Sequence, residues 1–401
     1  MQKQKKLIAT IIMCCGIAAA WAWVSDVASI NQKHLRVSAE LKPTRRDPFA
    51  QHLQQKMMKV VQNADHHARP VIFDTDAASD DALALILIGS DPGIRLLAIT
   101  VAGTGEAHGK PGANNMAALM KELGKPLIPV AYGRATALSD AGHSFPDSIR
   151  KAMDHLLLNT TVKQNTNAII TSDAVALMHQ AVTASAEKVT ILATGPLTNI
   201  AEFFHQYPTL KNKVGEIVIM GGAITVPGNI KAIAPEASND TAEWNFYADP
   251  EAVQQVFAAG VPVTLIALDA TNQVPLTRKF YEAISTEDEP ELKLAHQLIQ
   301  PYVKLLGEKV FFREFYMWDP LAAMVLIDPS VAETKMMSLN VNPSDGSLKV
   351  VKRGTKGSAI VKVVTKVHQP SRVLMNYVAM VKSNHLFVER KFNQAVSRTQ
   401  A

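Results

Sequence analysis

Short apolar runs alternate with longer amphipathic stretches from Val71 onward. Val71–Phe73 predicts a short buried strand, and Ala82–Ile88 predicts the start of a buried helix. We predict further strands at 94–101, 127–131, 188–193, 216–220 and 263–268, and helices at 113–123, 174–186, 250–259, 291–310 and 317–327. Strands that alternate with helices are typical of an α/β fold. We expect a doubly wound, mostly parallel, Rossmann-like sheet with right-handed crossovers and helices on both faces.

Three other features refine this prediction. The predicted helix at 291–310 contains Pro301, so we expect an interruption there. The last part of the chain alternates in a β manner, notably at 348–351 and 358–364. Two loops are expected at Gly133–Pro146 and Val226–Ala242. The second is long and irregular, and such loops in compact domains tend to be functional or disordered.

The N-terminus resembles a targeting segment. Three lysines, Lys3, Lys5 and Lys6, precede Leu7–Trp23, an apolar run of 17 residues that ends beside an A-x-A arrangement at 20–22. This pattern favours a cleaved secretory signal over residues 1–23. An uncleaved membrane anchor is the alternative, because the run is only slightly short for a span. We therefore expect an exported protein, periplasmic or extracellular, that contacts a membrane only through this segment if it is uncleaved.

The remaining chain divides at about residue 70. Residues 24–69 are mixed in polarity and predict a linker or stalk, whereas 70–401 carries the alternating strand and helix pattern of one folded domain. Of the 401 residues, 47% are hydrophobic and 19% are charged, so a substantial core is possible.

The net charge of +5 is unevenly distributed. Residues 347–401 have a net charge of +10 and residues 1–23 a net charge of +3, which leaves −8 for the rest. An acidic body suits a cation site. The basic C-terminal part is interpreted as a solvated face, the alternative being contact with nucleic acid or anionic lipid. No nucleic-acid partner is expected.

The acids Asp74, Asp76, Asp80 and Asp81 lie between the first predicted strand and helix. Ligands bind at the carboxyl ends of strands in open α/β sheets. Acids this close repel one another unless a cation joins them, and Ca²⁺ takes six to eight oxygen ligands. The plainer interpretation, a helix cap in a solvated acidic turn, does not explain the apolar flanks. We predict a site for a hard cation.

These acids also form a motif, DxDxxxDD after a strand, that resembles the opening motif of the nucleoside hydrolases. That family cleaves the N-glycosidic bond of ribonucleosides. The resemblance extends over about residues 70–380 and is carried by further motifs in the same order: Ala193-Thr194-Gly195-Pro196-Leu197-Thr198-Asn199, Met220-Gly221-Gly222, Gly228-Asn229, Ala242-Glu243-Trp244-Asn245, Asp249-Pro250-Glu251-Ala252 and Trp318-Asp319-Pro320.

The resemblance implies a Ca²⁺ site and a catalytic base. Asp76, Asp81 and Asp319 would supply carboxylates, and Thr194 would supply its backbone carbonyl, to one Ca²⁺. Carboxylate and carbonyl oxygens are the ligands that a hard ion prefers. The ribose 2′- and 3′-hydroxyls and a water would complete the shell. Asp76 would take the proton of that water, whose pKa the metal lowers.

The resemblance also implies substrate contacts. Asp80 would bind a ribose hydroxyl, and Asn229, Glu243 and Asn245 match positions that grip the ribose. Trp318 occupies a position where one branch of the family has a His, the presumed acid for the leaving base, and instead resembles the purine-preferring branch. A stacked indole eases protonation of a purine ring. The alternatives are a turn residue at Asn229, exposed polar side chains at 243 and 245, and a core residue at Trp318.

The chain departs from the family pattern at several positions. Thr104 replaces a common Asn, which weakens the expectation of a ribose contact there. Ala77-Ala78 replaces a usual Pro-Gly, so the turn loses the fixed φ of proline and the freedom of glycine. His108 and His143 lie in polar loops from which either is a candidate to reach a leaving base, although each also suits a surface position.

Two other functions compete with hydrolysis. Phe73-Asp74-Thr75-Asp76 resembles the nucleophile motif of haloacid-dehalogenase-like phosphatases, which would make Asp74 essential. A secreted nucleoside- or ribose-binding protein without catalysis is the other alternative. Asp74 itself is expected to orient the acidic loop. By analogy with the family, we expect a homo-oligomer, either a dimer or a tetramer.

Overall fold

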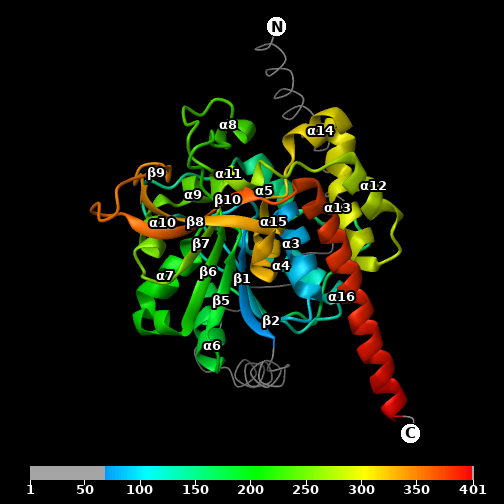
Figure 1. The fold of residues 1–401 in the computed structure, drawn as a ribbon. Helices are drawn as coiled ribbons and strands as arrows, with labels where there is room; N and C mark the ends of the chain where they lie inside the picture. The colour runs from blue at the N-terminus through cyan, green and yellow to red at the C-terminus, as the bar shows by residue number, and fades with distance from the viewer. Residues whose placement is uncertain (1–67, 400–401) are drawn as a thin grey trace, which may run out of the picture.

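Strand β1 (Arg69–Thr75) lies in the middle of a long sheet (Figure 1). This computed structural model describes the backbone of residues 68–399 and the side chains of residues 68–384. The predicted targeting segment, residues 1–23, and nearly all of the predicted linker lie outside the described residues. Among the described residues, no helix is both long and apolar enough to cross a membrane.

The sheet has ten strands in the order β4-β3-β2-β1-β5-β6-β7-β10-β8-β9. The strands other than β1 are β2 (Ile94–Val101), β3 (Val130–Tyr132), β4 (Ile170–Thr171), β5 (Val189–Ala193), β6 (Val214–Met220), β7 (Val263–Ile266), β8 (Ala332–Val341), β9 (Leu348–Val350) and β10 (Ala359–Val367). Pairing is parallel from β4 to β10 and antiparallel at β8 and β9. The predicted doubly wound, mostly parallel α/β fold is confirmed.

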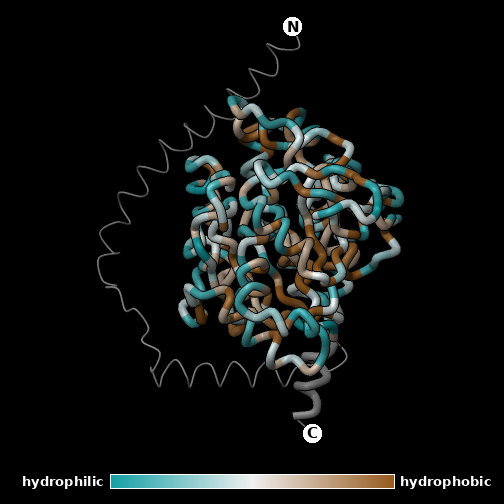
Figure 2. Tube along the Cα trace, turned by 90° about the vertical axis from the view of Figure 1, so that its left-hand side faces the viewer, coloured by the Kyte–Doolittle hydropathy of each residue, from teal (hydrophilic) through white to brown (hydrophobic). Residues whose placement is uncertain are grey.

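Helices cover both faces of the sheet (Figure 1). One face is covered by α6 (Ala174–Ala184), α7 (Thr198–Gln206) and α10 (Pro250–Phe257). The other face is covered by α3 (Ser79–Ser90), α4 (Gly109–Glu122), α13 (Pro290–Leu306), α15 (Trp318–Ile327) and α16 (Pro370–Thr399). The central strands are buried on both faces and are therefore mostly apolar, as parallel strands are. Figure 2 shows these hydrophobic segments inside the molecule.

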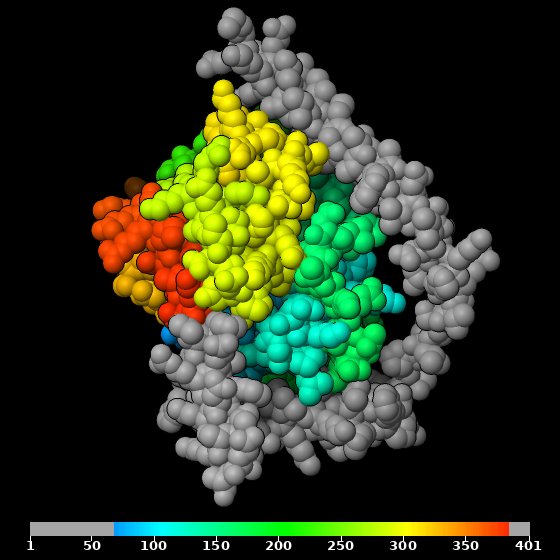
Figure 3. All heavy atoms as spheres, turned by 90° about the vertical axis from the view of Figure 1, so that its right-hand side faces the viewer, coloured from blue at the N-terminus to red at the C-terminus, as the bar shows by residue number. Residues whose placement is uncertain are grey.

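Shorter helices connect these layers: α5 (Asp147–Asp154), α8 (Ile230–Ile233), α9 (Trp244–Ala248), α11 (Leu268–Thr271), α12 (Arg278–Thr286) and α14 (Glu308–Glu314), with 3₁₀ turns η1 (Pro208–Lys213) and η2 (Pro329–Val331). Figure 3 shows the α12–α14 region, in yellow, against the green segment that follows α5. The Gln297 side chain of α13 accepts the backbone N–H of Thr161 there, at 3.1 Å.

The structure corrects two expectations. Helix α13 continues through Pro301 and ends at Gly307, whose φ of 73° stops the helix. The 226–242 loop contains the short helix α8. The basic C-terminal part completes the sheet and adds α16. Its side chains at 349, 352, 353 and 356 are exposed, and Lys362 pairs with Glu216 at 2.9 Å.

Candidate active site

The strand order reverses between β1 and β5, and the predicted acids lie at the carboxyl end of this switch point. Strand β1 ends at Thr75, directly before Asp76. Asp80 and Asp81 lie in the first turn of α3, and Asp319 lies in the first turn of α15, which packs against α3. The two helix N-termini therefore bring acids from distant parts of the sequence to the place where open α/β sheets bind ligands.

Asp80, Asp81 and Asp319 each offer one ligand atom, and these atoms lie within 4.8 Å of one another. Asp81 is held firmly: its carboxylate accepts hydrogen bonds from the hydroxyl of Thr75, from the hydroxyl of Thr194 at 2.6 Å and from the backbone N–H of Ala78 at 2.9 Å. This acid is therefore fixed by groups at the end of β1, directly after β5 and in the turn between β1 and α3.

Asp76 lies outside that trio but belongs to the same group of interacting charges. Burial and then the negative charge of Asp81 raise the pKa of Asp76 well above its ordinary value. Burial and the charges of Asp80, Asp81 and Asp76 do the same to the pKa of Asp319. For Asp80, burial with the charge of Asp81 raises the pKa to about 7. The acids lie close together in a largely buried site, and that arrangement favours a cation.

The donor set fits a hard divalent cation. Carboxylates converge on the site, and the Thr194 residue that contributes its hydroxyl to Asp81 has its backbone carbonyl at the end of β5. All of these ligand atoms are oxygens, which Ca²⁺ and Mg²⁺ prefer over nitrogen or sulfur. Buried carboxylates that repel one another gain most from such an ion.

Asp74 is separate from these acids. It is fully buried on β1, and its Oδ1 accepts hydrogen bonds from the Thr100 hydroxyl at 2.5 Å and from Asn199 Nδ2 at 2.8 Å. Burial raises the pKa of Asp74 to about 7. Its contacts tie β1 to β2 and α7, so its place in the fold is that of a support for the acidic loop.

Asn245 lies beside the Thr194 carbonyl. Its Nδ2 donates to that oxygen at 3.0 Å and to the Met220 carbonyl at 3.3 Å. The carboxylate of Glu243 accepts the backbone N–H of Gly222 at 2.8 Å and that of Asn245 at 3.0 Å. Burial raises the Glu243 pKa to about 7. Much of the hydrogen-bonding capacity of Glu243 is thus used to shape its own loop.

Asn229 and Trp318 have different surroundings. The Oδ1 of Asn229 accepts the backbone N–H of Trp244 at 3.0 Å, which joins the two ends of the 229–244 loop. Trp318 is half-buried, and its ring packs against Tyr316 and Phe315. It lines a narrow cavity with Asp80 and with other aromatic residues: Tyr302, Phe311, Phe315 and Tyr316.

The candidate histidines are held by other groups. The Nδ1 of His108 lies 2.8 Å from the Asp154 carboxylate, and the ring of His143 stacks on Tyr247 with centroids 3.8 Å apart. The Thr104 hydroxyl is buried and lies 2.9 Å from that of Thr198.

Glu106 is a site residue that the sequence reasoning missed. Its backbone N–H donates to Asp76 Oδ2 at 3.1 Å, and burial with the charges of Asp80 and Asp81 raises its pKa well above the ordinary value. The available signal was its position: an acid directly after Gly103-Thr104-Gly105, at the carboxyl end of the strand that pairs with β1.

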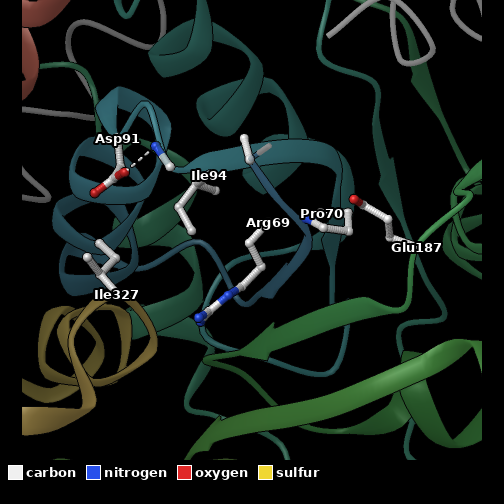
Figure 4. Close-up of a pocket in the computed structure, with 8 residues that line it drawn as sticks. Arg69, Pro70, Asp91, Ile94, Glu187 and Ile327 are labelled. Carbon is white, nitrogen blue, oxygen red and sulfur yellow. Dashed lines mark hydrogen bonds between the residues drawn. The ribbon is translucent and has the colours of Figure 1, made fainter. Parts of the chain in front are cut away.

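A separate cavity of about 430 Å³ lies at the opposite, amino end of β1 (Figure 4). Arg69, Asp91 and Glu187 contribute its polar groups, and none of the clustered acids lines it. Although this cavity is large, it lacks the clustered acids and is therefore not the candidate active site. The acids at the other end of the strand carry the chemistry.

Comparisons with known proteins identify a family of related enzymes. Residues 71–373 match the sequence profile of the family described as inosine-uridine preferring nucleoside hydrolase. The chain is 31% identical over 274 residues to the pyrimidine-specific ribonucleoside hydrolase RihA of Citrobacter koseri, an alignment that covers 67% of this chain and 82% of the relative. The RihA protein of Salmonella enteritidis is 30% identical over the same shares.

Solved structures give the same result. The inosine-uridine preferring nucleoside hydrolase of Bacillus anthracis has a TM-score of 0.67 and 27% identity, over 78% of this chain and 99% of that one. The purine-preferring ribonucleoside hydrolase of Gardnerella vaginalis has a TM-score of 0.66 and 25% identity, over 79% and 99% of the two chains.

Proposed function

The chain belongs to the inosine-uridine preferring nucleoside hydrolase family, and from this premise we propose that it hydrolyses the N-glycosidic bond of ribonucleosides with the help of Ca²⁺. The products are a free base and ribose. The observation that carries the proposal is the convergence of Asp80, Asp81 and Asp319 within 4.8 Å, beside the buried Asp76.

Asp76, Asp81, Asp319 and the Thr194 carbonyl would hold the ion, and Asp80 is close enough to the same point to act as a further ligand or as a partner of a ribose hydroxyl. When bound, a hard divalent cation makes a water more acidic and orients vicinal hydroxyls. Ca²⁺ suits this set because its coordination is flexible and tolerates many oxygen ligands.

The acids of this chain supply the remaining chemistry. Glycosidic cleavage passes through an oxocarbenium-like transition state that is positive at the sugar. Asp76 takes a proton from the attacking water as the general base. The other carboxylates stabilise the positive sugar. Asn245 holds the end of the 229–244 loop, which carries the proposed ribose contacts, against the Thr194 carbonyl.

We propose that purine nucleosides are favoured. Trp318 is half-buried beside Asp80, and a purine offers a larger ring than a pyrimidine for stacking on its indole. Stacking contributes roughly 0.5–1.5 kcal/mol beyond area burial, so it can set a preference without carrying catalysis. The relatives differ on this point, since RihA is named pyrimidine-specific and the Gardnerella enzyme purine-preferring.

The phosphatase alternative is not supported. A nucleophile must reach its substrate, whereas Asp74 is fully buried and bonded to Thr100 and Asn199. The non-catalytic binding protein is distinguished by assay. Purified protein is incubated with inosine, guanosine, adenosine, cytidine and uridine in millimolar Ca²⁺, and free base is separated by chromatography. Release of purine bases faster than of pyrimidine bases supports the proposal. Survival of every nucleoside with excess protein refutes hydrolysis.

We further propose that the protein is exported, on the strength of the lysines and the apolar run in residues 1–23, and that it forms a dimer or tetramer. Mass spectrometry of protein recovered from cell fractions tests the first proposal, because a mature chain lacking these residues outside the cytoplasm supports it. Sedimentation velocity tests the second, and a monomer at micromolar concentration refutes it.

A further inference from the structure

The turn Gly103–Ala107 presses against Asp76. The backbone N–H of Glu106 donates to Asp76 Oδ2 at 3.1 Å, and the N–H of Ala107 donates to the Asp76 carbonyl at 3.0 Å. A Cβ placed on Gly105 would lie 2.1 Å from the Cβ of Asp76, so only glycine allows this approach. The turn therefore fixes both the backbone and the carboxylate of the proposed base.

A turn with two glycines does not hold this shape by its own stiffness. Arg150 supplies the restraint. This side chain is only 7% exposed, and its Nη2 donates to the Gly103 carbonyl at 2.6 Å and to the Ala107 carbonyl at 3.2 Å. One guanidinium thus bonds to both ends of the turn that holds Asp76. A buried carbonyl deprived of its donor is costly, so the turn is expected to shift if the guanidinium is lost.

Helix α5, which carries Arg150, is itself anchored. The Asn115 side chain donates to the Met153 carbonyl at 2.9 Å, and Met153 is buried in the core. Asp154 accepts the backbone N–H of His108 at 2.8 Å, directly after the turn. Helix α5 therefore bonds to residues 103–108 through both Asp154 and Arg150. Its own anchoring holds the Arg150 backbone in place.

We propose that Arg150 is a positioning residue for nucleoside hydrolysis: through the Gly103–Ala107 turn it holds Asp76 where the base must act. The inference rests on the proposed function for its kinetic consequence. It makes a distinct structural claim, because the hydrogen bonds to the turn exist whether or not a nucleoside is cleaved. Arg150 acts through the turn and does not need to touch the substrate.

The first test is kinetic. In R150M the kcat for inosine falls about 10²-fold, as expected for a small misplacement of a reacting group, while KM changes less than about threefold. R150K recovers part of the loss, because one ammonium replaces one of the two hydrogen bonds. In R150A, millimolar guanidinium chloride restores activity several-fold. The matched control is K151M, which removes a neighbouring positive charge that pairs with Asp147 on α5 and leaves the turn untouched.

The second test needs no activity. Hydrogen exchange measured by mass spectrometry is expected to be faster at residues 103–108 in R150M than in the wild type, with melting temperature and exchange elsewhere little changed, and unchanged in K151M. Unchanged exchange at 103–108 overturns the inference. So does a kcat loss that follows the melting temperature and resists both R150K and guanidinium. If the wild type releases no base, the proposed function fails, and exchange alone decides the role of Arg150.

Discussion

Asn245 donates a hydrogen bond from Nδ2 to the backbone carbonyl of Thr194, across 3.0 Å. The same carbonyl belongs to the proposed cation site, while Asn245 belongs to the loop proposed to hold the ribose. A carbonyl oxygen has two lone pairs, so this contact leaves one for an ion. The sugar loop and the cation site are therefore mechanically joined through one amide.

Replacing Asn245 should damage both functions together. Asn245→Ala leaves the buried Thr194 carbonyl without this donor, a loss of about 1–3 kcal/mol. If this energy is lost from the transition state, kcat/KM for inosine should fall about 10- to 100-fold. The Ca²⁺ concentration needed for half-maximal activity should rise. Calorimetric Ca²⁺ titration and steady-state kinetics measure the two effects. Asn212→Ala, at an exposed position in η1, is the control. Weaker catalysis with unaltered Ca²⁺ affinity would contradict the link.

Trp318 should affect purine substrates more than pyrimidine substrates. Trp318→Ala removes an aromatic wall beside Asp80. Because stacking contributes roughly 0.5–1.5 kcal/mol, we expect kcat/KM to fall about threefold to tenfold for inosine and less for uridine. Trp318→Phe keeps an aromatic face and should retain most of the preference. An equal loss on both substrates would remove the stacking argument.

The order of strands and helices was predictable because apolar runs mark buried parallel strands wherever they occur. The predictions that failed concern local features of single elements. Pro301 was expected to interrupt a helix, but α13 tolerates it and ends instead at Gly307. In the basic C-terminal part, composition does not reveal that Lys362 pairs with Glu216, an acid far away in the sequence.

The turn Ala77-Ala78 gives a stability prediction. Sequence reasoning placed the unfavourable backbone at Ala78, whereas the structure has a φ of 65° at Ala77. Left-handed backbone costs an L-residue roughly 1–2 kcal/mol, so Ala77→Gly should be neutral or stabilising once the lost buried methyl is counted. Ala77→Pro forces φ to about −65° and removes the N–H that donates to Thr75, and should cost about 3 kcal/mol or more.

Urea unfolding of the Ala77→Gly and Ala77→Pro variants measures both effects. Wild-type stability in Ala77→Pro would show that the turn does not have this backbone. A large loss in Ala77→Gly would show that the packing of the methyl outweighs the strain.

The site residues that one motif supplies were predictable. Those that the fold brings together from distant parts of the sequence were not. Asp76, Asp80 and Asp81 come from one loop, and the family resemblance pointed to Asp319. Glu106 and Arg150 were missed, because neither belongs to the resemblance and their neighbours are assembled by the fold. The sequence likewise gave no sign that Glu243 would use its carboxylate on backbone N–H groups.

Stability without the metal should decrease as pH rises. Burial raises the pKa of Asp74, Asp80 and Glu243 to about 7 in the folded protein, whereas unfolded carboxyls titrate near pH ~4. Between about pH 4 and pH 7 the folded state therefore binds more protons, and stability falls across that window. Thermal unfolding in chelator at several pH values measures this slope.

Ca²⁺ should oppose the same slope, because it pairs with ionised carboxylates and competes with protons. The stabilisation that Ca²⁺ gives should be larger at about pH 7.5 than at about pH 5. A chelated protein that becomes more stable between these two values, or a Ca²⁺ effect independent of pH, would contradict the electrostatic description of the site.

The central claim is that Asp76 and the neighbouring acids form a Ca²⁺-dependent active site. The most direct measurement is the initial rate of hypoxanthine release from inosine, by wild type and by Asp76→Ala, first in excess chelator and then in saturating Ca²⁺. The exposed Asp140→Ala variant is the matched control. We predict no release in chelator, full recovery in Ca²⁺ for the wild type and the control, and no turnover by Asp76→Ala in either condition. A full rate in chelator, or a wild-type rate from Asp76→Ala, would contradict the claim.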